Sequence, residues 1–235
     1  MKAPAGSDWP AWLAHRAEAS GSESLRGYYA SLGWDPGQAI ADTPLVAVDL
    51  ETSGLDPRRH AILSIGVLPF TLQGIRLADR RQWLLRPPAG FSGESVAFHH
   101  ITHGDIEQAA DFEAVLPALL DTLAGRLMVV HYHPLERRFL DHATRMRLGE
   151  TLKCPMIDTM ELEARRHRQG WGSRWRALLG RTPTSLRLND SRARYGLPPY
   201  EGHRAVLDAL ATAELLQAQI QHAYNPSTPL ESLWV

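Results

Sequence analysis

A short apolar strand that ends in two acids constrains this chain more than any other feature. Residues 45–50 are mostly aliphatic, as in a buried β-strand, and Asp49 and Glu51 lie at the end of the run. Alternate side chains of a strand point to the same face, so these carboxylates project together. Paired carboxylates repel one another and are costly to bury unless a cation lies between them. The pattern favours an oxygen-preferring divalent ion such as Mg²⁺ or Mn²⁺, and two solvated acids at a strand edge are the alternative.

A second acidic position lies in the last third of the chain. Residues 205–216 have the apolar spacing of an amphipathic helix, and the helix-breaking run 196–199 precedes them. Asp208 can face a metal from this helix, and His203, at or just before the helix start, can reach the same cleft. A histidine there suits a general base that deprotonates a metal-bound water. Taken alone, both are ordinary surface residues, but with the two strand acids they indicate an active site.

These segments resemble the first and third motifs of the DEDDh 3′→5′ exonucleases, the superfamily of the proofreading subunit of bacterial replicative polymerases. The early match is Asp49-x-Glu51-Thr52-x-Gly54-Leu55, and the late match is His203-x-Ala205-x-x-Asp208-Ala209. The order and spacing of the motifs carry the resemblance, which covers residues 44–223.

The family's middle motif carries a fourth acid, and residues 129–140 correspond to it. His131 and Phe139 align with the family pattern, which places Glu136 where the family usually has Asp, and Tyr132 where it usually has Asn. Glutamate keeps the charge and the oxygen ligand but is longer by one methylene, about 1.5 Å. We therefore expect the metal site to survive with an adjusted backbone or a bidentate contact, and reduced or absent activity is the alternative.

Two further acids are candidates for the role of Glu136. Asp141 is expected to face elsewhere on the same helix. Asp158 precedes Thr159 in what resembles the family's Asp-Thr junction between a strand and a helix. Capping of a helix N-terminus is the simpler role for Asp158.

The resemblance implies a two-metal reaction. Asp49, Glu51, Glu136 and Asp208 are expected to bind two Mg²⁺ or Mn²⁺ ions, with His203 accepting the proton of the attacking water. This reaction releases nucleoside 5′-monophosphates from the 3′ ends of single-stranded or frayed nucleic acid. A catalytically silent nucleic-acid-binding or polymerase-accessory module is the alternative function, because Glu136 departs from the family pattern.

Two segments are expected to contact the substrate. Thr52, Ser53 and Gly54 can approach the terminal sugar through backbone groups, because glycine allows close contact. Phe98 and His99 resemble the family's loop ahead of its first helix, where an apolar residue and a histidine meet the terminal nucleotide. A histidine-rich surface loop, or a weak transition-metal site on its histidines, is the alternative for this second segment.

Composition and charge are compatible with this interpretation. The chain has 235 residues, of which 44% are hydrophobic, and one cysteine, Cys154, which excludes an internal disulfide. No run is long enough to span a bilayer, so we expect a soluble, cytoplasmic protein. Ten arginines between residues 165 and 204 face only Asp190 and Glu201, and they are expected to border the cleft and hold phosphates or to form a solvated helical face.

The order of elements predicts the fold class. We expect a helical extension at residues 1–42, an exonuclease domain at 43–223 and a tail at 224–235. The expected strands are 45–50, 61–71, 76–85, 127–130 and 156–157, and the expected helices between and after them are 112–123, 135–148 and 159–167. A meander of strands followed by alternating helices and strands predicts an α/β protein with a mixed sheet flanked by helices. By resemblance this is the ribonuclease H-like fold.

The expected partner is the 3′ end of a nucleic acid, with DNA favoured over RNA, and no membrane. A polymerase or a sliding clamp is a candidate protein partner, because residues 230–235 loosely resemble peptides that insert into clamp pockets. These residues are too apolar for a free tail, however, and we favour docking onto the chain's own domain.

Overall fold

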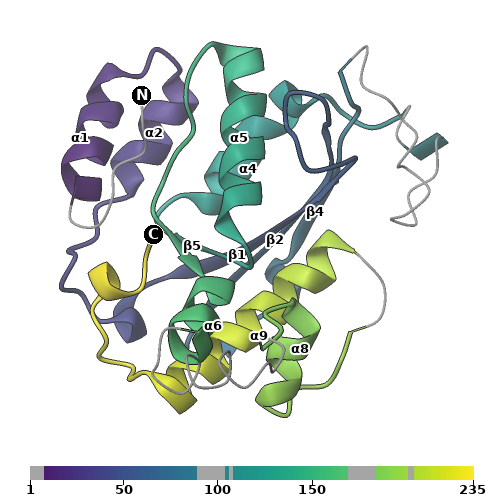
Figure 1. Cartoon of the computed structure of the whole chain (residues 1–235). Coiled ribbons are helices and arrows are strands. Elements are labelled where there is room, and N and C mark those ends of the chain that lie inside the picture. Colours follow the sequence, from purple (N-terminus) through teal and green to yellow (C-terminus); the bar gives the residue numbers. More distant parts are fainter. Residues whose placement is uncertain (1–7, 89–103, 106–107, 169–183, 201–203) are drawn as a thin grey trace.

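The computed structural model describes residues 8–88, 104–105, 108–168, 184–200 and 204–235. One mixed sheet runs through the molecule in the order β3-β2-β1-β5-β6, and β4 pairs with β2 (Figure 1). The strands are β1 (Leu45–Thr52), β2 (Ile62–Thr71), β3 (Gly74–Ile75), β4 (Arg81–Leu84), β5 (Leu127–Val130) and β6 (Met156–Asp158). β1 pairs antiparallel with β2 and parallel with β5, which in turn pairs parallel with β6.

Helices cover both faces of this sheet. The helices are α1 (Trp9–Ala19), α2 (Glu23–Ser31), α4 (Phe112–Leu123), α5 (His133–Leu148), α6 (Thr159–Arg168), α8 (Leu188–Arg194) and α9 (Ala205–Ala223). Short 3₁₀ turns occupy η2 (Ile40–Asp42), η3 (Leu77–Asp79) and η5 (Leu230–Ser232). In Figure 1, α4 and α5 lie on one side of the sheet, and α6, α8 and α9 lie on the other. The predicted fold class is confirmed.

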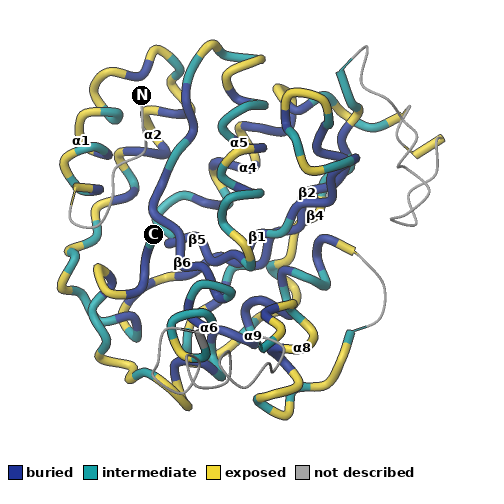
Figure 2. Tube along the Cα trace, in the orientation of Figure 1, coloured by how far each residue is buried: buried dark blue, intermediate teal, exposed yellow. Residues whose placement is uncertain are grey.

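The alternation of side chains along β1 divides the interior into two cores. Val46 and Val48 pack with residues of α4 and α5, whereas Leu45 and Ala47 pack with residues of α9. The strands β1, β2, β5 and β6 are buried along most of their length (Figure 2). Because the period of a strand is two, the odd-numbered residues that follow Ala47 also face α9. β1 therefore delivers its acids to the α9 side of the sheet.

The prediction of one continuous strand at residues 76–85 was wrong. The chain leaves the sheet edge after β3, makes the η3 turn and returns as β4. Arg76 forms an ion pair with Asp79 at 3.5 Å, and the Arg80 guanidinium donates to the Leu77 carbonyl at 2.9 Å. These local bonds stabilise a turn where an unbroken strand was expected.

The N-terminal extension is part of the folded domain. Its two helices bury Trp9, Leu25 and Tyr29. The Tyr29 hydroxyl donates to the Thr151 carbonyl at 2.8 Å, and the Arg137 guanidinium of α5 lies 5.5 Å from the Trp9 ring centroid. These contacts dock the extension onto the rest of the domain.

The C-terminal tail docks on the open edge of the sheet beside β6. Leu230, Leu233 and Trp234 are buried, and the Val235 amide donates to the Met156 carbonyl at 2.8 Å. Covering β6 in this way removes an exposed strand edge that would otherwise pair with other chains. The favoured prediction of self-docking agrees with this arrangement, because the side chains that a clamp would need are already in the core.

Deletion of residues 230–235 is expected to lower the melting temperature by about 10 °C or more. Each large apolar side chain removed from the core costs roughly 1.5–3 kcal/mol, and 1 kcal/mol corresponds to about 2–4 °C in a chain of this size. Thermal unfolding measures the effect, with the exposed Glu231→Ala as the matched control in the same turn. An unchanged melting temperature after deletion would contradict tail docking.

Candidate active site

Three acids from opposite ends of the chain converge at the carboxyl end of β1. One carboxylate oxygen from each of Asp49, Glu51 and Asp208 lies within 4.8 Å of the other two. Asp49 and Glu51 come from β1, and Asp208 comes from the first turn of α9. The β1–β2 register shifts between Glu51 and Thr52, a bulge that ends the regular pairing immediately after the second acid. The predicted convergence of the first and third motifs is therefore observed.

Gly66 allows α9 to come close enough for this convergence. It lies on β2 directly opposite Asp49. A Cβ atom at this position would lie 2.1 Å from the backbone carbon of Ala205 and 2.3 Å from the Val206 nitrogen. No side chain can occupy that space, so only glycine permits the start of α9 to touch the sheet here. The sequence contains this glycine, but nothing in the local pattern shows that a helix near the end of the chain packs on it.

Glu136 is the fourth acid, and it lies one turn into α5. Its side chain is 3% exposed, and its Oε2 atom has no hydrogen-bond partner among the described residues. Its charge acts on Asp49, although it is not one of the three acids whose oxygens lie within 4.8 Å of one another. A buried carboxylate oxygen without a partner is costly unless a cation binds it. The position of Glu136 is thus compatible with its predicted role in the metal site.

Burial and neighbouring charges raise the pKa values of two acids of this site, Asp49 and Glu136. Burial and then the charges of Glu136, Asp208 and Glu51 raise the pKa of Asp49 well above its ordinary value. Burial raises the pKa of Glu136 to about 8. Closely spaced hard oxygen ligands of one charge are what Mg²⁺ and Mn²⁺ require, and these ions would offset the repulsion. The residues therefore fit a divalent metal centre.

The raised pKa values predict how metal binding depends on pH. Unfolded carboxyl groups lose their protons near pH 4, so between about pH 5 and 8 the metal-free folded protein holds protons that the unfolded chain has released. Its free energy of unfolding should consequently decrease as the pH rises through this window. Metal requires the deprotonated forms, so the rise in melting temperature on adding Mg²⁺ should grow over the same window.

Thermal unfolding of EDTA-treated protein from pH 5.5 to 8.5, with and without Mg²⁺, measures this dependence. The Glu136→Gln variant is the control, because it removes the carboxyl whose pKa is raised to about 8. We expect this variant to show a smaller change with pH. A Mg²⁺ effect that is independent of pH in the wild type would contradict the electrostatic description.

Asp158 and Asp141, the two alternatives to Glu136, have structural roles. The Asp158 carboxylate accepts hydrogen bonds from the backbone amides of Tyr132 at 3.0 Å and Met160 at 2.9 Å. It therefore caps the N-termini of both α5 and α6, and the sequence context predicted the cap of α6 alone. Burial raises the pKa of Asp158, but hydrogen bonds from His133 outweigh this effect and hold the pKa below its ordinary value. Asp141 faces away from the cluster and accepts a bond from the Leu152 amide at 3.1 Å.

Glu136→Asp is expected to lower activity, even though aspartate is the family's usual residue. The start of α5 is held by Asp158, which accepts from the His133 amide at 2.9 Å, so the backbone is not free to advance. A side chain shorter by about 1.5 Å should then fall short of the metal site. Steady-state kinetics at several Mg²⁺ concentrations measure the loss, which we expect to be about tenfold or more. An increase in activity or metal affinity would show that Glu136 fits the site poorly.

The backbone conformation of Tyr132 is one that favours asparagine, the residue that the family usually has at this position. Its φ is 105°, and among the described residues other than glycine it is alone in having a positive φ. Asparagine, the residue the family usually has here, tolerates such a conformation better than tyrosine does. The strain is held by the Asp158 cap that accepts from the Tyr132 amide.

The turn after β1 is built around a histidine. The Ser53 hydroxyl oxygen accepts from the Ala61 amide at 3.1 Å, and the Thr52 hydroxyl donates to the Gly54 carbonyl at 2.8 Å. A Cβ on Gly54 would lie 2.6 Å from the His60 ring. A larger residue here would displace the His60 ring, and the predicted contact of this turn with a terminal sugar stays a prediction.

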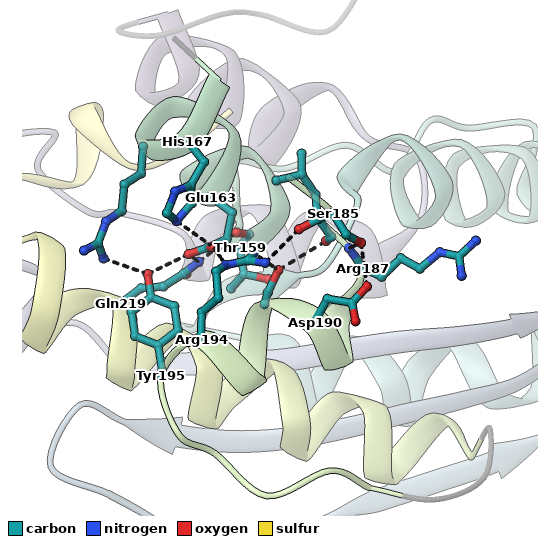
Figure 3. A network of polar contacts seen from close by, with 12 residues as sticks. Thr159, Glu163, His167, Ser185, Arg187, Asp190, Arg194, Tyr195 and Gln219 are labelled. Carbon is teal, nitrogen blue, oxygen red and sulfur yellow. Dashed lines mark hydrogen bonds and ion pairs between the residues drawn. The ribbon is translucent and has the colours of Figure 1, made fainter. Parts of the chain in front are cut away.

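A buried polar network fixes α9 and α6 together behind the site. The Glu163 carboxylate accepts from Arg194 at 2.7 Å, from Tyr195 at 2.6 Å and from Gln219 at 3.0 Å (Figure 3). Although burial opposes it, these hydrogen bonds hold the pKa of Glu163 below its ordinary value. The network joins α6, the end of α8 and α9, and thereby fixes the helix that carries Asp208.

Several arginines of the basic stretch at residues 165–204 form structural contacts of this kind. Arg194 pairs with Glu163, and the fully buried Arg192 pairs with Glu214 at 2.8 Å. Arg165 donates to the Ser232 carbonyl at 2.8 Å. These arginines stabilise helix packing, and a phosphate-binding role for the remainder of the stretch stays a prediction.

Three predicted site residues, His203, Phe98 and His99, lie outside the described residues. Their roles as general base and substrate contacts stay predictions. Arg204 and Ala205 are described, and α9 begins at Ala205, so His203 precedes the helix in the sequence, as expected.

Comparison with known proteins identifies the family. The model of the RNase T family, described as an exonuclease family, matches residues 46–216, the segment that contains all four acids. The chain belongs to the RNase T family of exonucleases. Its sequence motifs and fold place it in the DEDDh group, which confirms the predicted resemblance.

Two curated relatives are parts of DNA polymerases. The chain is 30% identical over 176 residues to the PolC-type DNA polymerase III of Thermotoga maritima, covering 75% of this chain and 12% of that protein. It is 22% identical over 176 residues to the DNA polymerase III epsilon subunit of Aquifex aeolicus, covering 75% of this chain and 80% of the relative. The chain thus spans about an eighth of the length of the PolC-type relative that it matches.

Solved structures share the fold at low sequence identity. The nuclease domain of 3′hExo, a DEDDh family member bound to rAMP, has a TM-score of 0.61 at 14% identity, covering 77% of this chain and 92% of that chain. Exonuclease X in complex with 5′ overhanging duplex DNA has a TM-score of 0.57 at 21% identity, covering 80% of this chain and 98% of that chain.

Within the described residues, no helix is long and apolar enough to cross a membrane.

Proposed function

We propose that this chain is a metal-dependent 3′→5′ exonuclease that releases nucleoside 5′-monophosphates from single-stranded or frayed 3′ ends. The observation that carries the proposal is the cluster of Asp49, Glu51 and Asp208, whose ligand oxygens lie within 4.8 Å of one another. The buried oxygen of Glu136, which has no partner among the described residues, supports a fourth ligand.

Asp49, Glu51, Glu136 and Asp208 would hold two Mg²⁺ or Mn²⁺ ions. When bound, these ions supply Lewis-acid stabilisation of the charge that develops on the scissile phosphate. The four acids would orient that phosphate through the metal site, and the packing of α9 on β1 and β2 brings Asp208 to the two strand acids. His203, two residues before α9, accepts the proton of the attacking water in its neutral form.

We favour DNA as the substrate. The relatives from Thermotoga maritima and Aquifex aeolicus are named as a DNA polymerase and a DNA polymerase subunit. The epsilon relative likewise supports a polymerase as a candidate protein partner of this chain. Discrimination against RNA depends on whether the site leaves room for the 2′-hydroxyl.

End-labelled oligonucleotides test this function. With Mg²⁺ or Mn²⁺, a 5′-labelled single strand should give a descending ladder, whereas a 3′-labelled strand should release its label at once as a mononucleotide. EDTA should abolish both reactions, and a matched RNA strand should be degraded more slowly. Retardation of the strand in a gel without degradation would overturn the proposal in favour of a silent nucleic-acid-binding module. This alternative arises because Glu136 replaces the aspartate that the family usually has.

A further inference from the structure

A polar groove runs between the turn after β1 and the outer face of α5. It has a volume of about 540 Å³ and is lined by Arg58 from the turn and by Arg138, His142 and Arg145 from the helix, among others. Among the described residues, no aromatic side chain other than this histidine lines it. We propose that this groove binds the phosphates of the nucleotides that precede the 3′ terminus of a single-stranded substrate, an inference that rests on the proposed exonuclease function.

The spacing of the helix residues suits a linear chain of charges. Arg138, His142 and Arg145 are separated by four and three positions on α5, so they lie on one face of the helix. The helix rises about 1.5 Å per residue, which places the two arginines about 10 Å apart along the axis. Arg58 provides a cation on the opposite wall of the groove.

Both walls of the groove belong to segments that also carry the acids, β1 with its following turn and the start of α5. Arg138 is two residues beyond Glu136 on α5, and Arg58 is four residues beyond the Gly54 turn that follows β1. A strand whose 3′ end lies at the acids can therefore continue between these two walls. Along α5, the groove residues Arg138, His142 and Arg145 follow Glu136 towards the C-terminal end of the helix.

The charges of the groove are available to a ligand. Arg58 is exposed, and its guanidinium has no hydrogen bond or ion pair within the described part of the chain. Arg138 lies 3.9 Å from Asp56, but their side chains are 59% and 46% exposed, so this ion pair is weak and a phosphate can replace it.

Asp141, the second acid of the groove, does not prevent the arginines from binding a phosphate. The Asp141 carboxylate is committed to the Thr151 hydroxyl and the Leu152 amide on its inner side. It also forms an ion pair with Arg145 at 3.1 Å, which leaves that guanidinium 45% exposed. Three arginines against two aspartates leave the groove with a net positive charge.

The chemistry of the lining identifies the part of the nucleic acid that it binds. Guanidinium groups form charge-assisted hydrogen bonds with phosphate oxygens, and such contacts carry no sequence information. A groove without Phe, Tyr or Trp offers no stacking platform for bases. Binding there should therefore depend on strand length and salt but not on base sequence.

Equilibrium binding of a twelve-nucleotide oligothymidylate in EDTA tests the groove without any cleavage. We expect the Arg58→Ala/Arg138→Ala double variant to bind roughly tenfold more weakly than the wild type at low salt. The slope of log K against log salt should fall by about 0.7 for each phosphate that the variant no longer neutralises. Asp56→Asn should change affinity in the opposite direction, because it removes the acid that faces Arg138.

Arg76→Ala is the matched control for the loss of an arginine. Arg76 is 82% exposed and directly follows β3. β3 pairs with the C-terminal end of β2, which lies beside the start of β1, whereas the acids lie at the other end of β1. This variant should retain wild-type affinity and slope. If the groove double variant behaves like this control, or if Asp56→Asn also weakens binding, the groove does not hold phosphates.

Hydrolysis of a dinucleotide separates the groove from the active site. A dinucleotide is too short to extend along the groove, so the double variant should cleave it at the wild-type rate while its KM for the twelve-nucleotide strand rises about tenfold. Equal losses on both substrates would overturn the inference, because the arginines would then act on the reacting end or on the fold. If the wild type cleaves neither substrate, the exonuclease proposal fails, whereas the binding experiment still decides the groove.

Discussion

Replacing Asp49 with asparagine is expected to lower kcat/KM by about 10²–10³-fold and to raise the melting temperature of the metal-free protein. Asparagine keeps the shape of the side chain but removes a charged ligand from the metal site, and single electrostatic contacts at a reacting centre are worth about 10²–10³. In the absence of metal the same change relieves repulsion, because the pKa of Asp49 is raised by burial and by its acidic neighbours.

Kinetics with Mg²⁺ and thermal unfolding in EDTA measure these two effects on the same preparation. Asp121→Asn, at an exposed position on α4, is the matched control and should change neither quantity. A variant that retains activity would remove Asp49 from the reaction. A lower melting temperature in EDTA would show that the acids do not repel one another in the folded state.

Gly66→Ala is expected to lower activity by about 10²-fold without touching any catalytic group. The new Cβ would lie 2.1 Å from the Ala205 backbone carbon, and backbone cannot yield as a flexible side chain can. The start of α9 must therefore move by about 1 Å, and a misplacement of that size can cost about 10²-fold in rate. Overpacking of this kind also destabilises a protein by about 1–3 kcal/mol.

The distinguishing measurement for Gly66→Ala is Mg²⁺ affinity, which should fall because Asp208 moves with α9. Gly74→Ala is the matched control, because a Cβ at Gly74 meets no atom within 4 Å. Loss of stability with unchanged metal affinity would mean that Gly66 serves the fold alone. Wild-type behaviour in every respect would contradict the close approach of α9 to β2.

Much of the fold follows from local pattern, and the exceptions have long-range causes. Helix 112–123 and strand 127–130 were predicted with the bounds that α4 and β5 have, because their apolar spacing is strong and their ends carry clear signals such as the Asp111 cap. The strand expected at 76–85 failed because the chain leaves the sheet between β3 and β4 and makes the η3 turn, which the apolar pattern does not show. α8 was not predicted, because Arg192 and Arg194 look solvated in the sequence and are paired only in the folded chain.

The candidate site divides in the same way. Alternation along a strand predicted that Asp49 and Glu51 share a face, and the family resemblance of the motifs predicted that Asp208 joins them. The role of Gly66 was not predictable, because it depends on a register and a helix packing that no local pattern encodes. The double cap made by Asp158 was anticipated only for one of its two helices.

Diffraction from crystals grown with Mn²⁺ and a nucleoside 5′-monophosphate tests the central claim most directly, because anomalous scattering locates manganese independently of the protein. The account predicts manganese peaks about 2.0–2.6 Å from carboxylate oxygens of Asp49 and Asp208, with Glu136 and Glu51 completing the site and the nucleotide phosphate beside the metal. An ordered nucleotide at these acids without manganese, or manganese bound only to histidines elsewhere, would contradict it.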